Sequence, residues 1–125
     1  MTDAADIRSA CERQLSFLVE RHGFAPPETE RIGHETYVRY HRGDRTLSIA
    51  WEPGLTPVVE LFQPAQSPAD KVEFWAARNG VARTRRFPRV RPTTKFNPND
   101  RAQLESYFGE VGAQLSKEEE SWLAT

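Results

Sequence analysis

This 125-residue chain has a single cysteine, no long apolar run and little net charge, and each of these features excludes a class of protein. The single cysteine, Cys11, excludes an intramolecular disulfide framework and fits a reducing compartment. No apolar run approaches the roughly 20 residues that span a bilayer. The first ten residues, MTDAADIRSA, are acidic and amphipathic rather than basic and then apolar, so we expect no secretory signal. Together these features predict a cytoplasmic protein without a membrane segment.

Motifs for catalysis, cofactors and metals are also lacking. The chain has no nucleophile elbow, P-loop, HExxH or dinucleotide fingerprint. Cys11 and His22 are eleven residues apart on one predicted helix, which separates them by about 16 Å. His34 and His41 would point to opposite faces of one strand. We therefore assign no catalytic, cofactor-binding or metal-ligating residue, although a small enzyme or ligand-binding domain with a site built from distant residues stays open.

Hydrophobic periodicity predicts one α+β domain over residues 1–125, in the order α-β-β-β-α-(extended arm)-α. The predicted helices are Asp3–His22, Ser67–Asn79 and one that starts at Asn97-Pro98, and the predicted strands are Glu35–His41, Leu47–Glu52 and Pro57–Gln63. Short turns between these strands indicate an antiparallel meander of three to four strands with helices packed on one face. The opposite face of such a sheet is commonly exposed to water.

Residues that stop and start helices refine these bounds. Gly23 is placed to end the first helix in the left-handed conformation. Asn97 followed by Pro98 has the pattern of a helix start. Ser116 and Glu119 have the spacing of a capping box, which predicts a separate short helix over residues 117–123.

Basic residues gather in the segment 83–96, RTRRFPRVRPTTKF. Phe74 to Asn99 holds seven basic residues and no acid, which leaves ten basic and eighteen acidic residues elsewhere, a balance of −8. As a strand, residues 83–96 would be confined to a sheet edge by two prolines four positions apart. As a polyproline-type arm they would present Phe87, Val90 and Phe96 at every third position to the domain and arginines outward. We expect the arm.

The arm and two strand aromatics give the predicted binding site. Its residues are Arg83, Arg85, Arg86, Arg89, Arg91, Lys95, Tyr37 and Tyr40. Arginine and tyrosine are enriched at protein interfaces, so we expect a protein-binding domain, of the immunity or adaptor type in general architecture, that docks an acidic partner.

Three other roles for the arginines stay open. Binding of nucleic acid is disfavoured, because the pI of about 6.3 lies well below the value of about 9 typical of basic binding domains. The arginines could instead balance the domain's own acids, such as the Glu105 and Glu110 side of the last helix, or bind a small anion.

Overall fold

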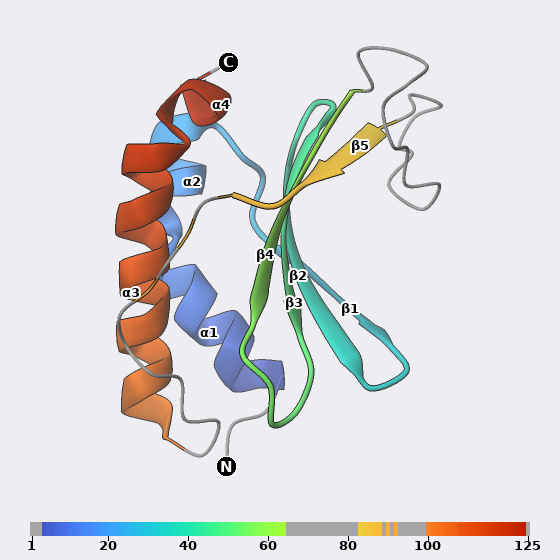
Figure 1. Ribbon diagram of the computed structural model, residues 1–125, viewed down its shortest axis with the longest axis vertical. Helices are drawn as coiled ribbons and strands as arrows, with labels where there is room; N and C mark the ends of the chain where they lie inside the picture. The colour runs from blue at the N-terminus through green and yellow to red at the C-terminus, as the bar shows by residue number, and fades with distance from the viewer. Residues whose placement is uncertain (1–3, 65–82, 89, 91, 93–99, 125) are drawn as a thin grey trace.

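The computed structural model describes residues 4–64, 83–88, 90, 92 and 100–124, and these form one sheet with helices packed against it. Its elements are α1 (Ala4–Gln14), α2 (Ser16–His22), β1 (Glu28–Ile32), β2 (Glu35–Arg42), β3 (Arg45–Trp51), β4 (Val58–Pro64), β5 (Arg83–Arg86), α3 (Arg101–Glu118) and α4 (Glu120–Ala124). The strands pair antiparallel in the order β1-β2-β3-β4-β5, and the helices cover one face (Figure 1). The predicted α+β class is confirmed, with five strands in place of three to four.

Two hairpins with two-residue loops set the register of the first three strands. Gly33 begins the loop between β1 and β2 at φ 62°, and Gly43 begins the loop between β2 and β3 at φ 59°. A left-handed residue in such a loop matches the twist of the two strands that it joins. The resulting register places Tyr37 opposite Ala50 and Tyr40 opposite Leu47.

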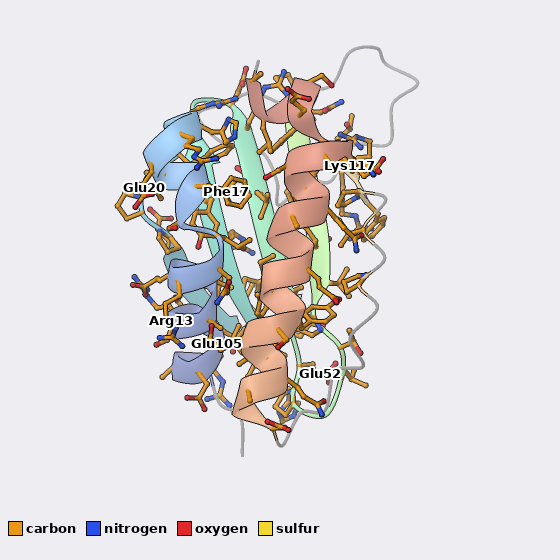
Figure 2. The ribbon with its side chains drawn as sticks, turned by 90° about the vertical axis from the view of Figure 1, so that its left-hand side faces the viewer. Arg13, Phe17, Glu20, Glu52, Glu105 and Lys117 are labelled. Atoms are coloured by element: carbon orange, nitrogen blue, oxygen red, sulfur yellow. The ribbon has the colours of Figure 1, made fainter. Side chains whose placement is uncertain are left out.

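The predicted first helix is divided in two at Leu15, which has φ −111° and ψ 20°. The backbone of α3 passes close to this division, since a Cβ atom at Gly112 would be 3.0 Å from the carbonyl oxygen of Gln14. Figure 2 shows α3 beside α1 and α2, with Arg13 and Glu105 at the contact. The Arg13 guanidinium pairs with the Glu105 carboxylate there. Gly23 ends α2 in the left-handed conformation, as predicted.

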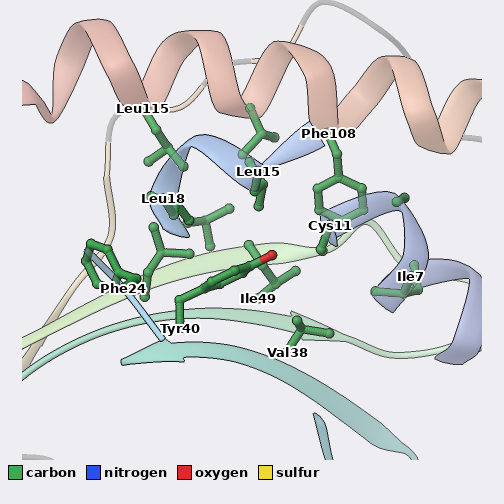
Figure 3. Packing of buried hydrophobic residues seen from close by; sticks show 14 of the residues in the cluster. Ile7, Cys11, Leu15, Leu18, Phe24, Val38, Tyr40, Ile49, Phe108 and Leu115 are labelled. Carbon is green, nitrogen blue, oxygen red and sulfur yellow. The ribbon is translucent and has the colours of Figure 1, made fainter. Parts of the chain in front are cut away.

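The core lies between the helices and the facing side of the sheet (Figure 3). Tyr40 from β2 packs there with Leu15, Leu18 and Phe108, and each of these side chains is at most 1% exposed. Burying a large apolar side chain stabilises a fold by roughly 1.5–3 kcal/mol. Cys11 is buried in the same cluster, as its helical position predicts.

Arg42 joins the ends of two helices to the sheet. Its Nη1 donates to the carbonyl oxygens of His22 and Leu123, at 2.6 Å each, and its guanidinium lies over the ring of Phe24. A cation at helix C-termini is favourable because the carbonyl groups there carry partial negative charge. The Phe24 ring also stacks on Trp122, so α4 is held by both polar and apolar contacts.

Helix starts near the C-terminus differ from the predicted ones. The carboxylate of Asp100 accepts from the amides of Ala102 and Gln103, and so it caps α3, whereas Asn97, the predicted start, lies outside the described residues. The short last helix exists, but it begins at Glu120, because Ser116 belongs to α3.

Several expectations about the strands also change. β1 has no counterpart in the predicted elements, and residues 83–86 are a strand of the sheet and not part of a polyproline-type arm. The predicted helix Ser67–Asn79 lies outside the described residues. Within the described ranges, no helix is long and apolar enough to cross a membrane.

Candidate functional site

The face of the sheet that points away from the helices, here called the second face, is the candidate site. Side chains at paired positions of an antiparallel sheet point to the same side, so the register assigns each residue to a face. The second face comprises Glu28, Glu30 and Ile32 of β1; Glu35, Tyr37, Arg39 and His41 of β2; Thr46, Ser48 and Ala50 of β3; Val58, Glu60 and Phe62 of β4; and Arg85 of β5. It is far more polar than the helix side.

The second face has a closed half and an open half. In the closed half, Thr46, Ser48, Glu60 and Phe62 are at most 5% exposed. The open half comprises Glu30, Ile32, Tyr37, Arg39 and Val58, together with Phe87, which follows β5 directly. Its exposed fractions are 53% for Ile32, 46% for Val58 and 56% for Phe87. Large apolar side chains are therefore in contact with water along this half.

Two hollows lie on or beside the open half. One, of about 390 Å³, is lined by Glu30, Ile32, Tyr37 and Arg39. The other, of about 210 Å³, is lined by Val58 and Phe87 together with Pro57, Val59, Pro88, Val90 and Tyr107. Tyr37 and Val58 are joined through Ala50 in the register, two strand spacings apart, which is about 10 Å. Val58 therefore belongs both to the open half and to the lining of the second hollow.

Aromatic rings of the open half are held by arginines. The Arg39 guanidinium carbon lies 4.6 Å from the centre of the Tyr37 ring, and that of Arg85 lies 5.2 Å from the centre of the Phe87 ring. The Tyr37 hydroxyl donates to the Glu35 carboxylate, and this bond raises the pKa of Tyr37 to about 12. These contacts fix the rings in place before any partner binds.

Arg85 and Arg86 point to opposite faces and each meets a buried carboxylate. Arg85 Nη1 lies 3.2 Å from Glu60 Oε2 on the second face, and the Glu60 side chain is 6% exposed. Arg86 makes a bidentate pair with Glu119, at 2.7 and 3.0 Å, between β5 and the junction of α3 and α4. The Glu119 hydrogen bond is the main cause that raises the pKa of Arg86.

The acidic partners of Arg85 and Arg86 within the domain are Glu60 and Glu119, and not the Glu105 and Glu110 side of the last helix that the sequence suggests. Glu105, which was expected to face the arm, is bound instead by Arg13 and Gln14. Glu60 and Glu119 carried no sequence signal for this role, because their pairing depends on the register of β4 with β5 and on where α3 ends.

The structure places the other predicted site residues in different parts of the molecule. Tyr40 is 1% exposed within the core, so its assignment to an exposed interface is wrong. Tyr37 lies on the second face, as one of the two tyrosines was expected to do. Phe87 is 56% exposed and is not part of the core on which the arm hypothesis placed it, whereas Val90 does pack against the core. The backbone of Arg83 belongs to β5, and Arg89, Arg91 and Lys95 lie outside the described residues.

A chain of acid, imidazole and hydroxyl crosses one end of the second face. Glu28 Oε2 lies 3.3 Å from His41 Nε2, and His41 Nδ1 lies 2.8 Å from Thr46 Oγ1. This order of groups can activate a hydroxyl nucleophile when the hydroxyl is open to substrate. Thr46 is 4% exposed, so its hydroxyl is not accessible, and the chain serves to tie β1, β2 and β3 together.

Cys11 and the metal candidates give no reactive centre in the described residues. Burial raises the pKa of the Cys11 thiol, which keeps it protonated and unreactive at neutral pH. Within the described part of the chain, no three His, Cys, Asp or Glu side chains are grouped so that they could hold a metal ion.

Comparison with protein-family models, curated proteins and solved structures finds no match for this chain.

Proposed function

We propose that this chain is a cytoplasmic protein-binding domain that docks its partner on the open half of the second face. The observation that carries the proposal is the exposure of large apolar side chains: Ile32 and Val58 on the side of the sheet away from the helices, and Phe87 directly after β5. Apolar patches of this kind, rimmed by polar residues, mark sites of protein interaction. The single buried cysteine supports the cytoplasmic assignment.

The composition and rigidity of the open half support the same function. Tyrosine and arginine are the residue types that dominate binding energy at interfaces, and Tyr37 and Arg39 lie side by side here. Their rings and guanidinium groups are already ordered by contacts within the sheet. A surface ordered in advance loses less conformational entropy when it binds.

The arginine segment contributes less to this surface than its sequence suggests. Arg85 and Arg86 are engaged by Glu60 and Glu119, so phosphate or an acidic partner would have to compete with carboxylates that are already in place. Docking of an acidic partner through Arg83, Arg89, Arg91 and Lys95 stays a prediction, since their side chains lie outside the described residues.

Co-purification from the native host tests the proposal. The triple variant Ile32→Ser, Val58→Ser and Phe87→Ser should lose a partner that the unchanged chain retains. The matched control is Leu55→Ser, because Leu55 is 55% exposed but lies in the turn between β3 and β4 and not on the sheet face. Retention of every partner by the triple variant, with an unchanged urea unfolding curve, would contradict the proposal.

A further inference from the structure

Acidic and basic side chains are sorted between the two faces of the sheet. The glutamates of β1, β2 and β4 all point to the second face: Glu28, Glu30, Glu35 and Glu60. The arginines Arg31, Arg42 and Arg45 point to the helix side, and Arg39 is the exception within these strands. Across β1 to β4 the second face therefore carries four carboxylates against the one guanidinium of Arg39, although the whole chain has a net charge of only −1.

The exposed fractions of the charged side chains increase this difference in charge between the two faces. The side chains of Glu28 and Glu30 are 69% and 54% exposed, whereas those of Arg39 and Arg85 are 15% and 29% exposed. Both arginines lie over aromatic rings, and the Arg39 guanidinium also pairs with the Glu30 carboxylate, while the side chains of Glu28 and Glu30 stay more than half exposed. An approaching partner meets negative charge first.

The acidic groups border the larger hollow. Glu30 lines it with Ile32 and Tyr37, and Glu35 accepts from the Tyr37 hydroxyl. Around this hollow, Glu28, Glu30 and Glu35 contribute three carboxylates on the second face against the one guanidinium of Arg39. The hollow of about 390 Å³ has room for a large apolar side chain.

From this arrangement we infer that the docked partner is basic: a protein segment that places an apolar side chain in the hollow and a neighbouring lysine or arginine against Glu28, Glu30 and Glu35. This inference rests on the proposed function and adds the chemistry of the partner. Charge-assisted hydrogen bonds favour such a cation, and an acidic segment would be repelled at the same place.

Defined peptides test the inference on the full ¹⁵N-labelled chain. Three synthetic peptides of equal length are titrated: one with lysine and arginine around leucine and tryptophan, one with glutamate in place of each cation, and one basic peptide with serine in place of each apolar residue. The first should shift the amide signals of Ile32, Tyr37 and Val58 at lower concentration than the other two. Raising the salt concentration from about 20 to about 300 mM should weaken the binding of the first peptide, because the charges are exposed.

Isosteric variants separate the charge from the shape of the surface. Glu28→Gln, Glu30→Gln and Glu35→Gln together should weaken the basic peptide about tenfold. Glu118→Gln with Glu120→Gln, which removes exposed acids from the helix layer, should leave its affinity unchanged. Preference for the acidic peptide, equal binding of all three peptides, shifts confined to the helices, or no binding at all would overturn the inference. The proposed function would still be judged separately, by the loss of partner in the apolar triple variant.

Discussion

The two faces of the sheet are formed by the same strands, yet they present opposite chemistry. The helix side contributes Val38, Tyr40, Leu47, Ile49, Trp51, Val59 and Leu61 to a single buried cluster. The second face carries buried polar groups in one half and exposed apolar groups in the other. The difference indicates that the helix side of the sheet contributes to the core, whereas the open half of the second face is exposed to water.

The neighbouring arginines of β5 show the same contrast on a smaller scale. Arg86 points to the helix side and closes the junction of α3 and α4 through two hydrogen bonds to Glu119. Arg85 points to the second face, where it meets Glu60 and also supports the exposed ring of Phe87. Alternation along a strand thus gives one arginine a structural role and the next a position beside the proposed docking surface.

The largest predicted effect is the difference in stability loss between a substitution on the helix side and one on the open half. Phe108→Ala removes a fully buried ring from the helix side and should lower the free energy of unfolding by about 3–5 kcal/mol. Val58→Ala, on the open half, should change it by no more than about 0.5 kcal/mol. Urea unfolding followed by circular dichroism measures both. Equal losses would mean that the open half of the second face stabilises the fold as much as the core does.

The next largest effect is a difference in stabilisation between the two arginine–glutamate pairs, Arg86–Glu119 and Arg85–Glu60. Glu119→Gln weakens a bidentate pair, and we expect a loss of about 1–2 kcal/mol, reduced by solvent at the 41% exposed Arg86 side chain. Glu60→Gln changes a pair with one longer contact and should have the smaller effect. A double-mutant cycle of Glu119→Gln with Arg86→Met should give a coupling free energy of about 1 kcal/mol. A coupling of zero would show that the pair adds nothing to stability.

A pair of glycines tests how closely α3 approaches the first helices. Gly112→Ala would place a Cβ 3.0 Å from the Gln14 carbonyl oxygen and 3.2 Å from Phe17, so stability should fall. Gly109→Ala meets the end of the Gln14 side chain at 3.3 Å, and that side chain can move aside. Because alanine favours a helix over glycine by about 1 kcal/mol, Gly109→Ala should be neutral or stabilising. Thermal unfolding of both variants provides the comparison, and a stabilised Gly112→Ala would contradict it.

The smallest effect concerns ionisation of the three tyrosines, Tyr37, Tyr40 and Tyr107. Their pKa values are all raised in the folded chain, that of Tyr37 to about 12 by its bond to Glu35, and those of Tyr40 and Tyr107 by burial. Above pH 10 the unfolded chain loses phenolic protons that the folded chain keeps, so stability should fall as the pH rises from 10 toward 12.

Absorbance of phenolate near 295 nm follows this titration. Tyr37→Phe should remove the phenolate transition near pH 12 that belongs to Tyr37. A variant whose absorbance change near pH 12 equals that of the unchanged chain would contradict the bond between Tyr37 and Glu35.

Sequence patterns indicated the central strands well and the edges poorly. β2, β3 and β4 have alternating apolar residues that a half-buried sheet requires, and Gly23 has the conformational freedom that the end of α2 needs. β1, with the sequence ETERI, is exposed at every position, so it has no apolar period to detect and exists through its hairpin with β2. β5 is four residues long and lies next to prolines, a combination that also suits an extended arm.

The candidate site could be predicted only in part for a related reason. Tyr37 was found because aromatic residues on opposite sides of a strand imply that one faces away from the core. The pairs Arg85–Glu60 and Arg86–Glu119 join residues 25 and 33 positions apart, and no local pattern indicates such contacts. The exposure of Phe87 was missed because an apolar residue at period three was assumed to pack on the domain.

Hydrogen–deuterium exchange of the chain, alone and with its co-purified partner, tests the central claim most directly. If the open half of the second face is the docking surface, the partner should slow amide exchange in β1, β2 and the start of β4, and leave α3 unchanged. Slower exchange confined to α3 and the α1–α2 pair would place the interface on the helix layer and contradict the account.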